Sequence, residues 1–250
     1  MYKVRLRGEE KSMLILGVDT STDSLTVSLI NEKKILADYT SLGKLKHSSL
    51  LIPAIQKAVK KINAKIDDID LFSIGIGPGS FTGLRVGVTS VRALAIALNK
   101  PIVGVPTLDA IANNGLAFLK KTKLSATFTK ICPILDAKKN QVYTCIYRHD
   151  GAKIIKESDY LLEPADALVR RLKGSILFLG DVIPLYKERL LNRKNFNAKF
   201  LDGRGWLPKG SVIAKIALRE YRRGRSDNPY DLVPMYLYAR DCNVRYDRQK

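Results

Sequence analysis

The sequence predicts an α/β fold in which mixed sheets, each opened by a three-strand meander, are covered by helices. Three observations favour this class. Short apolar runs alternate with amphipathic stretches along the 250 residues. The first three runs follow one another without a helix between them, as in an antiparallel meander, and the second half of the chain loosely repeats the order of the first. Meanders joined to strand–helix–strand units give mixed sheets with helical covers.

The first half of the chain begins with an apolar run, 13–18, which carries the polar turn 19–23 at its end. Residues 24–30 alternate with the period of two that is typical of a strand. The stretch 47–62 has an apolar stripe with helical spacing. The expected strands are 13–18, 24–30, 33–39, 71–76 and 102–105, and the expected helices are 47–62, 84–98 and 107–119.

The second half starts after a basic, hydroxyl-rich linker at 120–130. Its order of apolar runs and amphipathic stretches echoes the first half, although the residues themselves barely match. The expected strands are 131–135, 141–147, 152–157 and 175–179, and the expected helices are 164–172, 183–191 and 209–221. Beyond residue 221 the chain is basic with interleaved tyrosines, and we expect an extended tail.

Composition narrows the function classes. A formal net charge of +19 favours a polyanionic partner such as RNA, or an acidic protein surface, although a basic solvated surface alone gives the same number. Three scattered cysteines make no metal-binding spacing and indicate a reducing cytosol. We find no apolar run long enough to cross a membrane and no signal peptide at the start of the chain.

The stretch 77–83 (GPGSFTG) links the strand 71–76 to the helix 84–98. Glycines allow a sharp turn and a close approach, and Ser80 or Thr82 can cap the helix. A helix N-terminus that follows such a turn can bind an anion. The pattern matches neither the Walker loop nor the dinucleotide fingerprint. A phosphate-facing loop and a tight packing turn therefore both remain open.

Several segments occur in the order of a known family. They are 18–22 (VDTST), His47-Ser48 followed by Leu51 and Pro53, 77–85 (GPGSFTGLR), 104–108 (GVPTL), and 135–137 (LDA) followed by 142–143 (VY). Together they resemble the TsaB (YeaZ) family, the dimerization subunit of bacterial tRNA threonylcarbamoyladenosine synthesis. The match runs from about residue 13 to 182 and returns weakly at 234–237, and the string GPGSFTGLR is the specific part of it.

The resemblance implies an actin-like (ASKHA) fold of two lobes. It implies pairing with TsaD, the catalytic subunit, cooperation with the ATPase TsaE, and contact with tRNA through the complex. Alone, such a chain would form a homodimer in the cytoplasm. We expect a basic N-terminal extension at 1–12, a first lobe at 13–120 and a second lobe at 121–207. The C-terminal helix and basic tail at 208–250 would pack back on the first lobe.

The resemblance also implies site residues. A degenerate nucleotide site would comprise Asp19, Thr20, Ser21, Gly77, Gly79, Ser80, Thr82 and Gly83. The dimer interface would comprise His47, Leu51, Ile55, Ala58, Ile62, Arg85, Gly87, Val91 and Leu94. Arg222, Arg223 and Arg225 are candidates for contact with tRNA phosphates.

Two readings of these residues stay open. Asp19 can hold a hydrated cation or cap the turn at the end of its strand, and both helices of the interface can simply cover their own sheet. Catalytic relatives carry a His-x-x-x-His pair where this chain has Thr107 and Ile111, so we predict no metal, no transfer chemistry in the isolated chain and no tightly bound cofactor. ATP or ADP with Mg is expected only in the complex.

A different class of function, an actin-like ATPase or phosphotransferase, would use Asp19 and the glycine-rich loop. A peptidase is not supported, because the sequence contains neither HExxH nor GxSxG.

Overall fold

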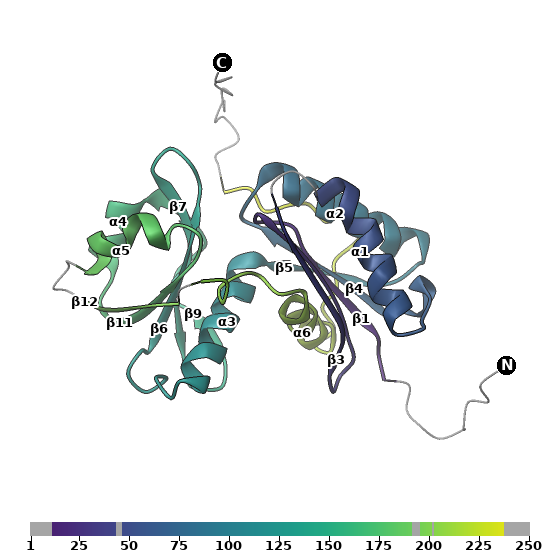
Figure 1. Cartoon of the computed structure of the whole chain (residues 1–250), viewed down its shortest axis with the longest axis horizontal. Helices are drawn as coiled ribbons and strands as arrows, with labels where there is room; N and C mark the ends of the chain where they lie inside the picture. Colours follow the sequence, from purple (N-terminus) through teal and green to yellow (C-terminus); the bar gives the residue numbers. More distant parts are fainter. Residues whose placement is uncertain (1–11, 44–46, 192–195, 202, 238–250) are drawn as a thin grey trace, which may run out of the picture.

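The computed structural model describes residues 12–43, 47–191, 196–201 and 203–237, which form two lobes, each built on one sheet (Figure 1). The predicted extension at 1–12 falls almost wholly outside these residues, as does the tail beyond 237.

The first lobe contains β1 (Ile15–Asp19), β2 (Ser24–Ile30), β3 (Ile35–Leu42), α1 (His47–Lys61), the short 3-10 helix η1 (Ile66–Asp68), β4 (Leu71–Gly77), α2 (Phe81–Ala97), β5 (Ile102–Pro106) and α3 (Thr107–Lys121).

The sheet of the first lobe has the strand order β3-β2-β1-β4-β5. The first three strands are antiparallel, as predicted for a meander, and β4 and β5 join β1 in parallel. Helices α1 and α2 pack against one face, where Leu16, Val27 and Ile74 meet Leu51 and Val91 in one core. The carboxyl ends of β1 and β4 therefore deliver the turn 19–23 and the glycine-rich loop to the same edge of the sheet.

The second lobe repeats this plan. It contains β6 (Lys130–Asp136), β7 (Gln141–Thr144), β8 (Tyr147–His149), β9 (Ile154–Lys156), β10 (Leu161–Pro164), α4 (Ala165–Arg171), β11 (Gly174–Leu179), α5 (Ile183–Leu191) and β12 (Phe196–Phe200). The last helix, α6 (Gly210–Tyr221), follows it in the chain but packs on the first lobe. Its main strand order is β10-β7-β6-β11-β12. This order matches β3-β2-β1-β4-β5 of the first lobe position by position, with β6 at the place of β1 and β11 at the place of β4. The predicted echo between the two halves is confirmed, as is the mixed α/β class.

Three details of the second lobe differ from the prediction. The strand expected at 141–147 is two strands, because β7 pairs with β10 while β8 pairs with β6 and β9. At the break the backbone N–H of Ile146 donates to the Ser158 hydroxyl instead of to a neighbouring strand. Strands β10 and β12 were not predicted. Each is short, and β12 (FNAKF) carries polar residues between its two phenylalanines.

Helices α3 and α6 lie between the two sheets (Figure 1). Helix α6 packs on the face of the first sheet that is opposite α1 and α2, with Ile213, Ala214 and Ala217 fully buried against Ile15 and Ala110. Helix α3 contributes Leu108 and Ile111 to the core of the second lobe. In the part of the chain that the structure describes, no helix is both long and apolar enough to span a membrane.

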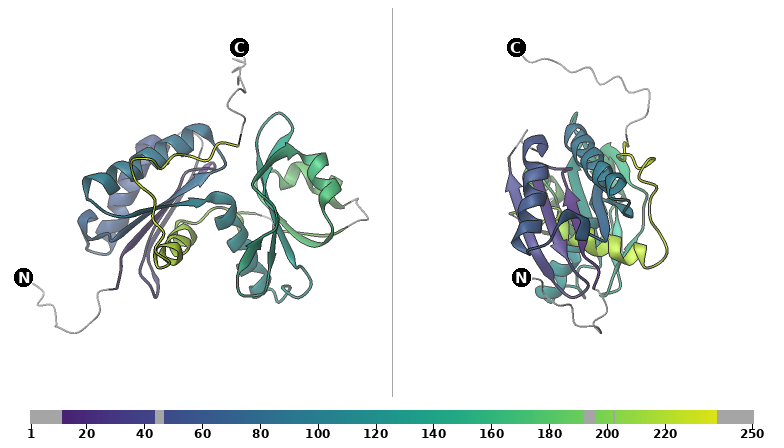
Figure 2. Two further views of the ribbon diagram at one scale, coloured as in Figure 1. Left: turned by 180° about the vertical axis from the view of Figure 1, so that it is seen from behind. Right: turned by 90° about the vertical axis from the view of Figure 1, so that its right-hand side faces the viewer.

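After α6 the chain turns back over the first lobe as an irregular segment, residues 226–237, which we call the strap. Asp227 forms a bridge with Ile102 of β5, and Leu232 is buried in the core beneath α1 and α2. The N–H of Met235 donates to the carbonyl of Ile76. Two views show the strap running alongside α2 (Figure 2). The outer layer of the first lobe therefore consists of α1, α2 and the strap.

Candidate functional site

The carboxylate of Asp19 is fully buried at the end of β1 and has its partners inside the protein. Ser21 donates to Oδ1 from its backbone N–H at 2.9 Å and from its hydroxyl at 2.7 Å. The Thr107 hydroxyl donates to Oδ2 at 2.9 Å. Burial raises the pKa of Asp19, although these hydrogen bonds oppose the shift. Asp19 acts in this structure as the cap of its own turn, one of the two readings that the sequence left open.

The glycine-rich loop is docked on the turn that follows β1. The N–H of Ser80 donates to the Ser21 carbonyl at 2.7 Å, and the Thr20 hydroxyl donates to the carbonyl of Gly83 at 2.8 Å. A Cβ at Gly79 would overlap the Ser21 carbonyl, and one at Gly83 would overlap the Thr20 carbonyl. The glycines thus permit a close approach between two segments of this chain. Nucleotide binding by these residues stays a prediction.

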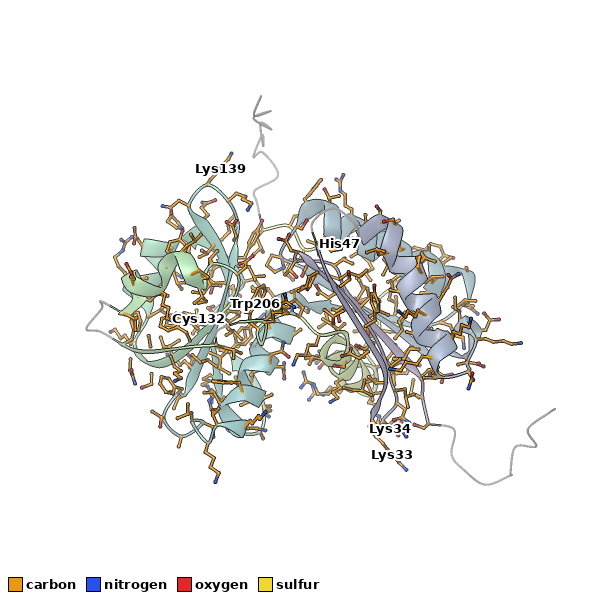
Figure 3. All side chains as sticks on the ribbon, in the orientation of Figure 1. Lys33, Lys34, His47, Cys132, Lys139 and Trp206 are labelled. Carbon is orange, nitrogen blue, oxygen red and sulfur yellow. The ribbon has the colours of Figure 1, made fainter. Side chains whose placement is uncertain are left out.

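The first turn of α2 presents the polar part of the loop. The Ser80 hydroxyl accepts the N–H of Gly83 and caps the helix, whereas Thr82 is exposed. Phe81 is also exposed, and the Arg85 guanidinium lies over its ring, 3.9 Å from the centroid. His47, at the start of α1 (Figure 3), contacts the turn 19–23 through a 2.9 Å hydrogen bond between its Nε2 and the Thr22 carbonyl.

The apolar stripe assigned to a dimer interface faces the chain's own sheet. Leu51, Ile55 and Ala58 are buried in the core of the first lobe, and Val91 joins them from α2. Ile62 and Leu94 are partly buried against the same core, and Gly87 is buried beside Thr20. The fully buried members of the stripe are thus occupied by the chain's own core, whereas Ile62 and Leu94 keep part of their surface exposed, and a dimer interface formed by these two helices stays a prediction. Of the nine residues predicted, only Arg85 is exposed, while the others are buried or half-buried.

The opposite face of α1 and α2 is the one that reaches solvent. We call this surface the outward face. Its exposed residues are Ser48, Ser49, Ile52, Pro53 and Gln56 of α1 and Thr82, Thr89, Ala93 and Ala97 of α2. These nine residues are uncharged, but exposed charges share the surface with them. Arg85 lies between Thr82 and Thr89 at helical spacing, and Lys57, Lys60 and Lys61 are exposed along the second half of α1. The small side chains on this surface let another helix approach closely, which suits contact with another protein.

A second polar group lies at the corresponding edge of the second sheet, around Asp136 of the segment 135–137. The N–H of Asp136 donates to the Asp181 carboxylate at 2.9 Å, and Lys138 pairs with Asp136. Asp181 is exposed by surface area but is crowded by surrounding protein atoms, and this partial burial raises its pKa to about 6. Asp136 is the last residue of a buried strand and Asp181 comes two residues after another, and these positions are the signal that the sequence offers. Among the described residues, no three His, Cys, Asp or Glu side chains are grouped to hold a metal.

Thr107 and Ile111, the two positions at which the resemblance led us to expect no metal, lie on α3. Thr107, its first residue, donates to Asp19 and accepts the N–H of Gly77 at 3.3 Å. Ile111 is fully buried in the core of the second lobe. Both positions therefore serve packing and local hydrogen bonding.

The three arginines assigned to tRNA follow α6 and are exposed. Each is paired with an acidic residue: Arg222 with Glu32, and Arg223 and Arg225 with Glu220 at 3.0 and 2.9 Å. Ion pairs of exposed side chains are weak. A polyanion can therefore still compete for these guanidiniums, and their contact with tRNA stays a prediction.

The two matching sheets, with helices on both faces, define an actin-like fold. Comparison with known proteins agrees with this class. YeaZ from Pseudomonas aeruginosa superimposes with a TM-score of 0.74 at 21% identity, covering 90% of this chain and 100% of that one. Residues 35–178 match the family profile described as TsaD, tRNA N6-adenosine threonylcarbamoyltransferase.

Curated relatives narrow the class further. The tRNA threonylcarbamoyladenosine biosynthesis protein TsaB of Bacillus subtilis is 31% identical over 94% of this chain and 98% of its own length. The TsaB of Escherichia coli is 27% identical over 90% of this chain and 94% of its own length. The chain belongs to the TsaB (YeaZ) family, and its function lies in tRNA threonylcarbamoyladenosine biosynthesis.

Proposed function

We propose that this chain is a non-catalytic scaffold subunit of the threonylcarbamoyladenosine machinery. It pairs with TsaD and acts with TsaE to support threonylcarbamoyl transfer to the adenosine next to the anticodon of ANN-decoding tRNAs. Alone it forms a homodimer. It holds no tightly bound cofactor, and ATP or ADP with Mg binds in the complex. Free thiols at Cys132 and Cys145 are consistent with work in the cytoplasm.

The outward face of α1 and α2 is the observation that carries this proposal. Small and uncharged residues along α2, namely Thr82, Thr89 and Ala93, allow the helices of a partner to approach closely. Removing the uncharged part of this surface from water on pairing is favourable. The buried apolar stripe meanwhile holds the two helices on their own sheet, so the face is presented by a rigid layer.

Engagement of the loop residues with one another favours a scaffold over an enzyme. The Asp19 carboxylate accepts hydrogen bonds from the Ser21 and Thr107 hydroxyls, and the glycine-rich loop packs on the same turn. An ATPase that used Asp19 would first have to release these buried hydrogen bonds, and each unsatisfied group costs about 1–3 kcal/mol.

The test is co-purification with the TsaD of the same source, sized by light scattering. Thr89→Glu places a charge at the middle of the outward face and should abolish the heterodimer while the protein stays folded. Leu185→Glu adds the same charge to an exposed position on α5, where 74% of the residue is accessible, and should pair normally. Failure of the wild-type chain to form a complex would contradict the proposal.

The enzyme alternative has its own test. Magnesium-dependent ATP turnover by the purified wild-type chain, lost in Asp19→Asn, would support an actin-like ATPase and refute the scaffold role as stated. Contact with tRNA is tested by replacing Arg222, Arg223 and Arg225 with Gln and titrating binding against salt. Equal affinity of both proteins at every salt concentration would remove these arginines from the tRNA contact.

A further inference from the structure

Large apolar side chains that stay exposed are concentrated on one layer of the first lobe. Among the described residues nine large hydrophobic residues are exposed, and five of them lie on α1, α2 or the strap. These five are Ile52, Phe81, Tyr230, Val233 and Tyr236. A cluster of this kind on one surface marks an interaction site more often than chance exposure does.

The strap is held firmly from beneath. The Arg92 guanidinium of α2 donates to three of its carbonyls, those of Pro229, Tyr230 and Leu232, at 2.7, 2.7 and 2.8 Å. The Asp227 carboxylate accepts the N–H of Gly104 in β5 at 2.7 Å. With Leu232 buried in the core, the segment has little freedom to turn its outward side chains inward.

Three large apolar or aromatic side chains are exposed along the strap, next to the exposed and acidic Asp231. Tyr230, Val233 and Tyr236 recur at every third residue and are 68%, 62% and 46% exposed. Tyr236 meets Phe81 of α2, with ring centroids 5.4 Å apart, and its hydroxyl accepts a 3.3 Å hydrogen bond from Nε of Arg85. The strap therefore continues the outward face past α2 with tyrosine, phenylalanine and arginine, which are enriched in protein interfaces.

The area of the outward face indicates whether a partner must also cover the exposed side chains of the strap. Helices of 15 and 17 residues are roughly 22–25 Å long and together about 20 Å wide, so their face spans roughly 500 Å². A stable interface buries about 800 Å² on each partner. The strip from Tyr230 to Tyr236 is about 20 Å long and adds roughly 200 Å². A partner that covers both surfaces comes close to the standard size, whereas one that covers the helices alone falls short.

We propose that the strap is the third element of the pairing surface and that the TsaD-type subunit covers it together with α1 and α2. This inference rests on the proposed function and names the residues that anchor the partner. Tyr230, Val233 and Tyr236 insert as apolar anchors, and Arg85 stays at the edge of the contact. Because Arg92 already fixes the strap before the partner binds, little conformational entropy is lost when the complex forms.

The experiment measures the affinity of the full-length chain for its TsaD by isothermal titration calorimetry. Val233→Glu should weaken binding by about thirtyfold and Tyr230→Ser by about tenfold. Both proteins should melt at the wild-type temperature, since both side chains are more than 60% exposed. Leu185→Glu is the matched control and should bind as the wild type does. Arg92→Met, which releases the strap without changing its outward residues, should also weaken binding.

The possible results separate the two proposals. If Val233→Glu and Tyr230→Ser bind TsaD as the wild type does while Thr89→Glu fails to bind, the strap inference is overturned and the scaffold role stands. If Thr89→Glu also binds normally, pairing through the outward face is overturned. If Val233→Glu disrupts only self-association of this chain, the occupant of the strap is a second copy, and the assignment to TsaD is wrong.

Discussion

Leu51 offers the sharpest test of which face of α1 points inward. Its side chain is fully buried in the core formed by β1, β2, β4 and the two covering helices. Replacing a buried leucine by alanine removes its apolar contacts and leaves a cavity, which costs about 3 kcal/mol. In a protein of this size that loss lowers the melting temperature by about 6–12 °C.

The assay is a thermal melt followed by circular dichroism, with Ile52→Ala as the control. Ile52 is the next residue on the same helix and is 37% exposed on the outward face. Ile52→Ala should change stability by about 0.5 kcal/mol or less. Leu51→Ala should still bind TsaD well below its melting temperature. The reasoning is refuted if Leu51→Ala melts like the wild type and loses binding, because its side chain would then face the partner.

Three further changes probe the edges of the two sheets. Asp19→Ala should destabilise the fold by about 2–3 kcal/mol in urea denaturation, because its buried donors lose their acceptor, and Asp19→Asn should lose less. Gly83→Ala should cost about 2 kcal/mol, because its Cβ overlaps the Thr20 carbonyl; a gain in stability would contradict the docking of the loop. Asp181 has a raised pKa of about 6 in the folded chain, against an ordinary 3.8, so its stabilising contribution is complete below about pH 4 and is lost as the pH rises through 6. Asp181→Asn should therefore gain stability relative to wild type at pH 8 but not at pH 4, and a carboxyl NMR titration with a midpoint near 4 would contradict this.

Much of the fold could be predicted because the strongest signals come from burial. Parallel strands such as β4 and β11 are covered on both faces, so their sequences are nearly continuous apolar runs. The edge strands β10 and β12 are less covered and carry no such run, which is why they were missed. The repeated order of elements was visible because both lobes bury their sheets in the same way.

The glycine-rich loop shows where local sequence stops being informative. Glycines at 79 and 83 indicate that another group approaches the backbone closely. A phosphate and a carbonyl oxygen would both need a residue without a Cβ, so the glycines do not distinguish between them. The structure places the carbonyls of Ser21 and Thr20 there. These residues come from a turn about 60 positions earlier, and only the parallel pairing of β1 with β4 brings the two turns together.

Helix α1 illustrates the same limit for interfaces. Periodicity identifies its apolar stripe correctly. It does not say which surface buries the stripe, and in this structure the chain's own sheet does so. The surface left for a partner is then the face that periodicity classes as polar, where Ser49, Gln56 and Thr89 look like ordinary solvent-facing residues. What distinguishes it is the grouping of exposed large apolar residues such as Ile52, Phe81 and Val233, and these residues belong to three segments that become neighbours only when the strap folds back on α2. An interface of this kind has no local sequence signature, because the elements that build it are joined by the fold.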